Sequence, residues 1–234
     1  MLIWFVVLYL IVSIGIGLYA STKVKNSTDY VVAGRHLPLP FIIATVFATW
    51  FGSETVLGIP AKFLNDGLSG VIADPFGSSM CLVLVGLFFA RPLYRMKLLT
   101  IGDYYRSRYG RTVEVVTSLC IVISYLGWVS AQITALGLVF SVLTGGAISP
   151  AWGMVLGVAI VLVYTLAGGM FSVAFTDLFQ MLIIALGMIY IAFAVSDIAG
   201  GAGTVIEHAR AAGKFEFWPK PEAGEIIGFV AAWA

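Results

Sequence analysis

Residues 41–64 read FIIATVFATWFGSETVLGIPAKFL, an apolar stretch that is interrupted by a carboxylate, two glycines and a proline. A helix needs about 20 mostly apolar residues to cross a membrane, so this stretch is long enough. Glu54 lies near its middle, where an ionised carboxylate facing lipid would be costly. Gly52, Gly58 and Pro60 loosen the helix, and carbonyls freed at that depth need protein or a water-filled cavity around them. The stretch predicts a discontinuous membrane helix with a polar cluster, a pattern typical of transporter binding sites. The alternative is a kinked helix whose Glu54 pairs with a neighbour.

The composition of the whole chain is typical of an integral membrane protein. Of its 234 residues, 60% are hydrophobic and 11% are charged, whereas about a quarter of an ordinary soluble domain is charged. The net charge of +1 gives no reason to expect a nucleic acid or an acidic partner. Cys81 and Cys120 lie in apolar runs without the spacing of a metal site or a disulfide, so we interpret them as packing residues.

Apolar stretches of membrane-spanning length recur along the chain. A polar connection, 198–225, follows the last of them, and a further apolar run begins at residue 226. Because the chain ends inside that run, we expect it to be incomplete. The expected spans are 2–20, 41–64, 70–95, 112–143, 150–167 and 172–197.

Positive charges gather in the first and third connections between these spans. The second connection has only Lys62, and the fourth, 144–150, has no charge. Cytoplasmic loops collect Lys and Arg, so we expect the N-terminus outside. The charges follow segment 2–20 instead of preceding it, which favours a retained helix over a signal peptide cleaved after Ala20. The basic residues of the two connections are Lys23, Lys25, Arg35, Arg91, Arg95, Lys97, Arg106, Arg108 and Arg111.

The sixth span carries a polar stripe. Ser172, Thr176 and Gln180 recur every four residues, which places them on one helical face, with Asp177 beside them. Two interpretations stay open at this point. The face is functional, or the residues are favourable caps at a helix N-terminus.

The fourth span has a similar face, formed by Ser124, Trp128 and Gln132. Trp in a membrane helix is commonly an interface anchor. Trp128, however, lies well inside its span between two polar neighbours one turn away, so a cavity-facing role and a packing role are both open.

Three groups of residues, in order along the chain, carry a resemblance to a known family. They are DYVVAGR at 29–35, TIGDY at 100–104 with RYG at 108–110, and YTLAGGM at 164–170 with Thr176, Asp177 and Gln180. Together they resemble the sodium:solute symporter family. The resemblance implies an all-α, polytopic fold of the LeuT type, with two inverted five-helix repeats and an extra N-terminal helix. Residues 1–21 would be the accessory helix, 41–197 the first repeat, 198–225 an extracellular connection, and 226–234 the start of a truncated second repeat.

The resemblance also implies Na⁺-driven uptake of a small organic solute by alternating access. In that family two backbone carbonyls of the broken helix bind the coupling ion, and the matching positions are Ala48 and Phe51. Such ligands suit a hard cation that prefers oxygen. Asp177 matches an acid at the inner gate, on the sodium exit route. The remaining ligands would come from the second repeat, which is an expected partner together with the lipid bilayer.

The resemblance further implies a set of substrate-binding residues. Glu54 and Thr55 match contact positions in sugar-transporting relatives. The sequences ATWFG at 48–52 and GLFFARP at 86–92 are similar to the high-affinity choline transporter branch, where aromatic side chains hold a quaternary ammonium by cation–π attraction. An amine, an amino acid or another small polar solute is the expected substrate, because Ser78 stands where that branch has a tyrosine. The expected substrate-binding residues are Trp50, Glu54, Thr55, Ser78, Trp128 and Gln132.

Functions of other classes fit the sequence less well than transport. Symporter-like domains also occur fused to signalling modules, so a membrane sensor is the alternative. A channel is disfavoured because no filter-like loop is visible. An enzyme is not expected, since neither His36 nor His208 has a partner spaced for a metal or a nucleophile. We expect the protein in the plasma membrane, that is, the cytoplasmic or inner membrane.

Overall fold

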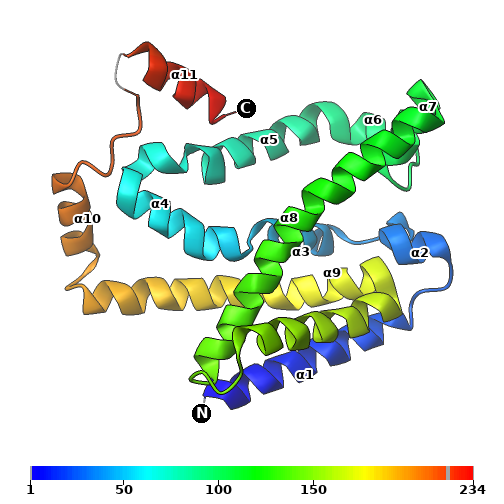
Figure 1. Ribbon diagram of the computed structural model, residues 1–234, viewed down its shortest axis with the longest axis horizontal. Coiled ribbons are helices and arrows are strands. Elements are labelled where there is room, and N and C mark those ends of the chain that lie inside the picture. The colour runs from blue at the N-terminus through cyan, green and yellow to red at the C-terminus, as the bar shows by residue number, and fades with distance from the viewer. Residues whose placement is uncertain (1, 220–221, 234) are drawn as a thin grey trace. The chain divides into compact units, whose positions relative to one another are not determined.

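The computed structural model describes residues 2–219 and 222–233, and every regular element in those ranges is helical (Figure 1). The expected all-α class is therefore confirmed. Residues 220 and 221 of the expected connection 198–225, and residue 234 of the last apolar run, lie outside the described ranges. The α-helices are α1 (Leu2–Ser21), α2 (Ser27–Val32), α3 (Leu39–Trp50), α4 (Ile59–Asp66), α5 (Ser78–Leu84), α6 (Ala90–Arg95), α7 (Ile101–Tyr109), α8 (Arg111–Leu143), α9 (Pro150–Ile198), α10 (Ala202–Ala211) and α11 (Ala223–Ala231). Shorter 3₁₀ or π segments are η1 (Ala33–Arg35), η2 (Glu54–Gly58), η3 (Gly67–Val71), η4 (Ile72–Gly77) and η5 (Val85–Phe89).

Several of these helices are long and apolar enough to cross a membrane. Four stretches meet the test, and the bent pair 27–35 and 39–50 adds a fifth if it counts as one span. Two of the four, 54–95 and 150–198, are 42 and 49 residues long, about twice the length that one crossing needs. Each contains a backbone break, at Asp74 (φ −142°, ψ 120°) and at Gly169 (φ 51°, ψ −136°). The breaks lie close to the expected ends of spans, and the division into six spans stays a prediction.

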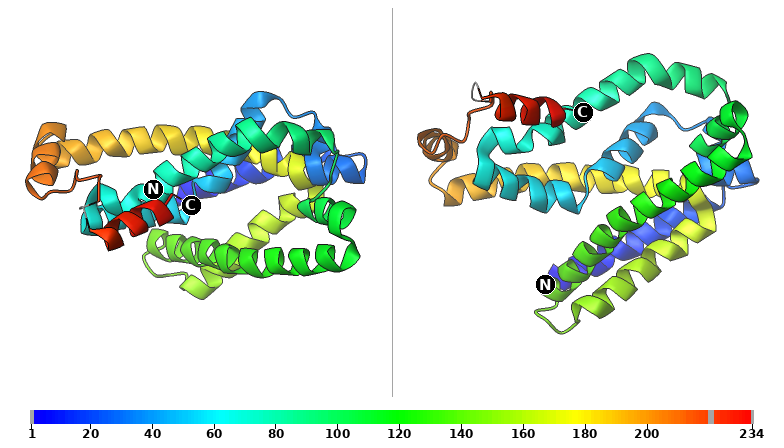
Figure 2. Two further views of the ribbon diagram at one scale, coloured as in Figure 1. Left: turned by 90° about the horizontal axis from the view of Figure 1, so that it is seen from above. Right: turned by 45° about the horizontal axis from the view of Figure 1, so that its top comes forward.

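The chain divides into two compact units. The first unit contains residues 1–50 and 98–183, and its α1 packs along α9 (Figures 1 and 2). A Cβ atom added at Gly17 would lie 2.5 Å from the Cβ of Tyr164, so the two backbones approach closely only because residue 17 is glycine. The Ser172 hydroxyl donates a hydrogen bond to the Gly17 carbonyl at 2.5 Å. The accessory segment is thus an integral part of this unit.

Small residues also bring α8 and α9 together in the first unit. A Cβ added at Gly153 would lie 2.8 Å from the carbonyl oxygen of Gly137, and one added at Gly157 would lie 2.1 Å from Leu136 Cδ2. Apolar side chains gain little by moving from lipid to protein, so membrane helices associate through such close van der Waals packing.

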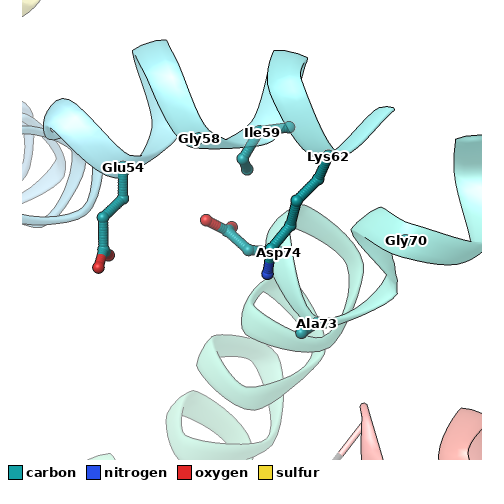
Figure 3. Close-up of a pocket in the computed structure, with 7 residues that line it drawn as sticks. All are labelled: Glu54, Gly58, Ile59, Lys62, Gly70, Ala73 and Asp74. Atoms are coloured by element: carbon teal, nitrogen blue, oxygen red, sulfur yellow. The ribbon is translucent and has the colours of Figure 1, made fainter. Parts of the chain in front are cut away.

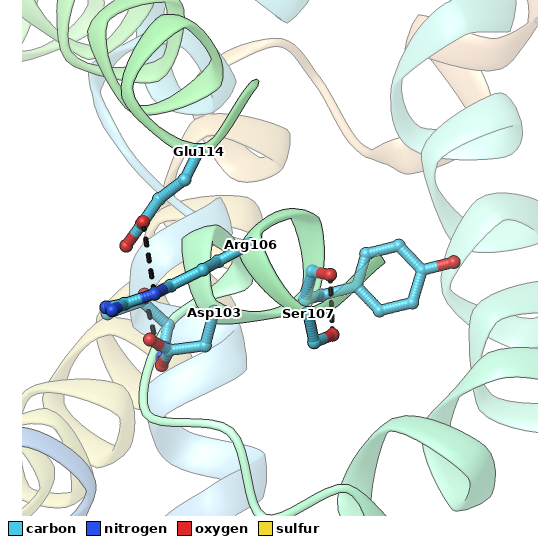
Figure 4. Close-up of polar contacts among 6 residues, drawn as sticks. Asp103, Arg106, Ser107 and Glu114 are labelled. Carbon is cyan, nitrogen blue, oxygen red and sulfur yellow. Dashed lines mark hydrogen bonds and ion pairs between the residues drawn. The ribbon is translucent and has the colours of Figure 1, made fainter. Parts of the chain in front are cut away.

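The two basic connections meet in the first unit. Arg35, after α2, donates a hydrogen bond from Nη2 to the Leu98 carbonyl at 2.6 Å. At the start of α7 the Asp103 carboxylate accepts from the Thr100 amide at 2.8 Å. Arg106 then pairs with Glu114 of α8 at 3.7 Å (Figure 4). The two basic connections are therefore neighbours in this unit, and their common cytoplasmic side stays a prediction.

The second unit contains residues 51–97 and 184–234. In this unit the expected connection that follows α9 packs against the hairpin formed by α4 and η4. The Leu68 amide donates to the Lys214 carbonyl at 2.8 Å, and Lys214 Nζ donates to the Asn65 carbonyl at 2.8 Å. Phe217 meets the ring of Phe76 edge-on, with centroids 5.3 Å apart. These contacts join segments that are about 150 residues apart in the sequence.

Candidate functional site

The broken helix expected over 41–64 is present. Helix α3 ends at Trp50, the next two residues form a bend, and the chain resumes as the π-type turn η2, Glu54–Gly58. Pro60 stands in the first turn of α4, where its missing N–H costs no helical hydrogen bond. The end of a helix leaves its last carbonyls without an intrahelical partner. Ala48 lies in the last turn of α3, and Phe51 follows the helix.

Within the second unit, a pocket of about 250 Å³ opens beside this turn (Figure 3). Glu54 and Lys62 project into it from the same helical stretch, and Asp74 projects from the neighbouring segment. Glu54 is the predicted substrate-binding residue that lines this pocket. The lining residues are Glu54, Gly58, Ile59, Lys62, Gly70, Ala73 and Asp74.

Ser78, another predicted substrate-binding residue, does not line the pocket itself but contacts Asp74, which does. Its Oγ donates to Asp74 Oδ1 at 3.1 Å and to the Ala73 carbonyl at 2.9 Å. Thr55 is half-buried and does not line the pocket. The sequence contained a signal for Lys62, because positions 54, 58 and 62 share one helical face. It contained none for Asp74, whose place depends on the turn between the two segments.

In the first unit, α3 packs on the second half of α9. The rings of Phe41 and Phe175 lie 4.7 Å apart. The Asp177 side chain is only 8% exposed and lies next to the Thr45 hydroxyl, about one turn before Ala48. Among the described residues, no basic side chain forms an ion pair with Asp177. Ionisation of a buried carboxyl group without a basic partner is costly unless hydrogen bonds or a bound cation stabilise the charge.

The polar stripe of α9 faces the accessory helix. Ser172 and Thr176 are almost fully buried, at 0% and 1% exposure. Thr176 donates to the Ser172 carbonyl at 3.0 Å, so both hydroxyls act as donors to carbonyls. Capping hydroxyls accept from amides, whereas the hydrogen bonds described for these two hydroxyls run to carbonyls. Gln180 lines a separate cavity of about 150 Å³ with Tyr9 and other residues of α1, α8 and α9.

Trp128 and Gln132 lie on α8 in the first unit, and Trp50 ends α3 in the same unit. Trp128 is 37% exposed and contacts Tyr125 edge-on, with ring centroids 6.2 Å apart. An aromatic cage that includes Trp50 and Trp128 stays a prediction. In residues 2–219 and 222–233 there is no group of three or more His, Cys, Asp or Glu side chains arranged to hold a metal ion.

Comparison with known proteins assigns the chain to a family. The sequence profile of the sodium:solute symporter family matches residues 30–222. The chain belongs to this family. Its members are transporters, not enzymes, and the chain is an integral membrane protein. The symporter fold is also recognised in a solved structure of a Na⁺-coupled sialic acid symporter in its substrate-bound outward-open state. The TM-score is 0.81 at 24% identity, and the match covers 96% of this chain and 48% of that chain. The expected LeuT-type fold is thereby confirmed.

Named relatives of this symporter chain include transporters of different solutes. It is 30% identical over 219 residues to the human high affinity choline transporter 1, a match that covers 89% of this chain and 37% of the human protein. It is 31% identical over 205 residues to the choline transporter of Torpedo marmorata, covering 83% of this chain and 35% of the relative. The sodium-coupled monocarboxylate transporter 2 of Danio rerio is 27% identical over 212 residues, covering 88% and 33%. The chain therefore spans little more than a third of the length of these relatives.

Proposed function

We propose that the protein couples the entry of Na⁺ to the uptake of a small organic solute by alternating access. Family membership supports this, because the named relatives transport organic solutes and two are described as Na⁺-coupled. The observation that carries the proposal is the buried Asp177 carboxyl group beside α3, about one turn before Ala48. A cation that leaves the broken helix would meet this group next.

In this proposal the backbone carbonyls of Ala48 and Phe51 supply part of the sodium site. A helix break suits the task, because Na⁺ is a hard cation that accepts carbonyl oxygens without regard to side chains. Asp177 stabilises the ion on its inner route. The other ligands come from a second five-helix repeat.

The solute occupies the region around the break, in contact with members of the predicted set. These are Trp50, Glu54, Thr55, Ser78, Trp128 and Gln132. The contact of Arg35 with Leu98 supports one shared side for the two basic connections. We assign that side to the cytoplasm of a plasma membrane, with the N-terminus outside.

The test is uptake into proteoliposomes that contain the complete polypeptide encoded by the gene. Uptake of a transported solute is measured with an inward Na⁺ gradient and with K⁺ in its place. We expect uptake only with Na⁺. In Asp177→Asn the Na⁺ concentration for half-maximal uptake should rise about tenfold, which corresponds to about 1.4 kcal/mol.

Asp197→Asn is the matched control, since it removes the same charge from an exposed position on the same helix. Its Na⁺ dependence should equal that of the wild type. Equal uptake in Na⁺ and K⁺ would refute coupling. An unchanged Na⁺ dependence in Asp177→Asn would refute the role of this residue.

A further inference from the structure

A second pocket, of about 340 Å³, lies in the first unit where α7 meets the start of α8. Helix α7 ends at Tyr109, and Gly110 (φ 90°, ψ 176°) redirects the chain into α8, in a conformation that favours glycine. Arg106 in the last turn of α7 and Arg111 in the first turn of α8 therefore line the same pocket. The other lining residues are Glu114, Val115, Ser118, Leu119 and Val122.

One of the two guanidinium groups in this pocket already has acidic partners. Arg106 Nε lies 3.7 Å from Glu114 Oε2, and Figure 4 shows the guanidinium group of Arg106 between Glu114 and Asp103. In the part of the chain that the structure describes, no carboxylate forms an ion pair with Arg111. A guanidinium group presents its donors in a planar fork that matches a phosphate group. Arg111 is thus the group in the pocket that remains for a phosphate.

An apolar stripe leads from Arg111 along α8. Val115, Leu119 and Val122 follow Arg111 at intervals of three or four residues, so all four lie on one face of the helix. The three apolar side chains are 48%, 57% and 54% exposed. At 1.5 Å per residue the stripe from residue 111 to residue 122 covers about 16 Å. Half of the hydrocarbon core of a bilayer is about 15 Å thick, so the stripe matches the depth of one leaflet.

The surroundings of the pocket are typical of a membrane–water interface. Helix α8 is long and apolar enough to cross a membrane, and it begins at Arg111. On α7 the ring of Tyr105 contacts those of Tyr104 and Tyr109, with centroids 5.5 and 6.2 Å apart. Tyrosine is enriched at the level of the lipid headgroups because its ring is apolar and its hydroxyl is polar. This connection is also predicted to be cytoplasmic, and anionic lipids are concentrated in the cytoplasmic leaflet.

We propose that this pocket binds an anionic phospholipid, with the phosphate group at Arg111 and an acyl chain along Val115, Leu119 and Val122. The inference goes beyond the proposed function, because it concerns the membrane around the protein and not the transported solute. A free phosphate would leave the apolar stripe unused. A zwitterionic headgroup would bring an ammonium group close to Arg111, so an anionic headgroup is preferred.

The experiment is native mass spectrometry of the complete polypeptide encoded by the gene, kept in detergent and titrated with phospholipid. Palmitoyl-oleoyl phosphatidylglycerol (POPG) is the anionic probe, and the phosphatidylcholine with the same acyl chains (POPC) is the zwitterionic reference. We expect the first POPG to bind about tenfold more tightly than the first POPC, which corresponds to about 1.4 kcal/mol. Arg111→Gln should remove this preference and leave the affinity for POPC unchanged, which also shows that the variant is folded. Glu114→Gln releases Arg106 and should tighten the binding of POPG, an effect that misfolding cannot produce.

Arg108→Gln is the matched control, because it removes the same charge from α7 without touching the pocket. Arg108 does not line the pocket, and its guanidinium carbon lies 5.7 Å from the centroid of the Tyr109 ring. This variant should keep the preference of the wild type. Equal affinities of the wild type for POPG and POPC, an unchanged preference in Arg111→Gln, or the same loss in Arg108→Gln would each overturn the site. Displacement of POPG by an excess of glycerol 3-phosphate would overturn the lipid as the occupant, because that ester supplies the phosphate without acyl chains.

Discussion

Gly169 marks the break in α9, and its replacement by alanine tests how the first unit is held together. Its backbone (φ 51°, ψ −136°) lies in a region that only glycine adopts readily. Holding another residue there costs about 1–3 kcal/mol. A Cβ atom would also stand 2.3 Å from the Tyr30 carbonyl oxygen and 2.9 Å from two atoms of its ring.

Tyr30 has little freedom to move aside. Its hydroxyl donates to the carbonyls of Thr165 and Leu166, at 3.3 Å in each case. Overpacking of a fixed neighbour costs about 1–3 kcal/mol. With the backbone strain, Gly169→Ala should lower the free energy of unfolding by about 2–6 kcal/mol.

The assay is unfolding of the purified chain in mild detergent by added denaturing detergent, followed by circular dichroism. Gly127→Ala on α8 is the matched control, because nothing lies within 4 Å of a Cβ added there. Its expected effect is a gain of up to about 1 kcal/mol from helix propensity. If the two variants unfolded at the same detergent fraction, the proposed strain and contact at Gly169 would be wrong.

Two further predictions concern hydrogen bonds in the first unit. Ser172→Ala removes the donor to the buried Gly17 carbonyl and should cost about 1–2 kcal/mol in the same unfolding assay. Ser130→Ala, whose hydroxyl bonds only carbonyls of its own helix, should cost less, and equal losses would contradict the role of the interhelical bond. At the start of α7, hydrogen bonds from the Thr100 amide lower the pKa of Asp103. A lowered pKa means that the ionised group stabilises the fold above its unfolded pKa and loses this effect as the pH falls through the folded pKa. Asp103→Asn should therefore lower the melting temperature at pH 7, and the difference from the wild type should shrink as the pH falls through the lowered folded pKa of Asp103; a difference independent of pH would refute the assignment.

Much of the architecture was predictable from local sequence. The apolar lengths predicted membrane helices, and the glycines and proline of 41–64 predicted the break after Trp50 that the structure contains. These features depend on hydrophobicity and backbone freedom within one segment, which the sequence states directly. The family motifs predicted the LeuT-type fold.

The contacts between segments needed the tertiary structure. The spacing of Ser172 and Thr176 placed them on one face but did not identify the carbonyl of Gly17, 155 residues away, as the partner of Ser172. For the same reason, the sequence did not predict that Asp74 lines the pocket together with Glu54 and Lys62. Helical periodicity determines which residues share a face, whereas helix packing and the turns between helices determine what that face meets. The sequence alone thus determined a broken membrane helix with a carboxylate near its middle, and only the tertiary structure added the lysine and the second carboxylate that give its pocket a charge pattern.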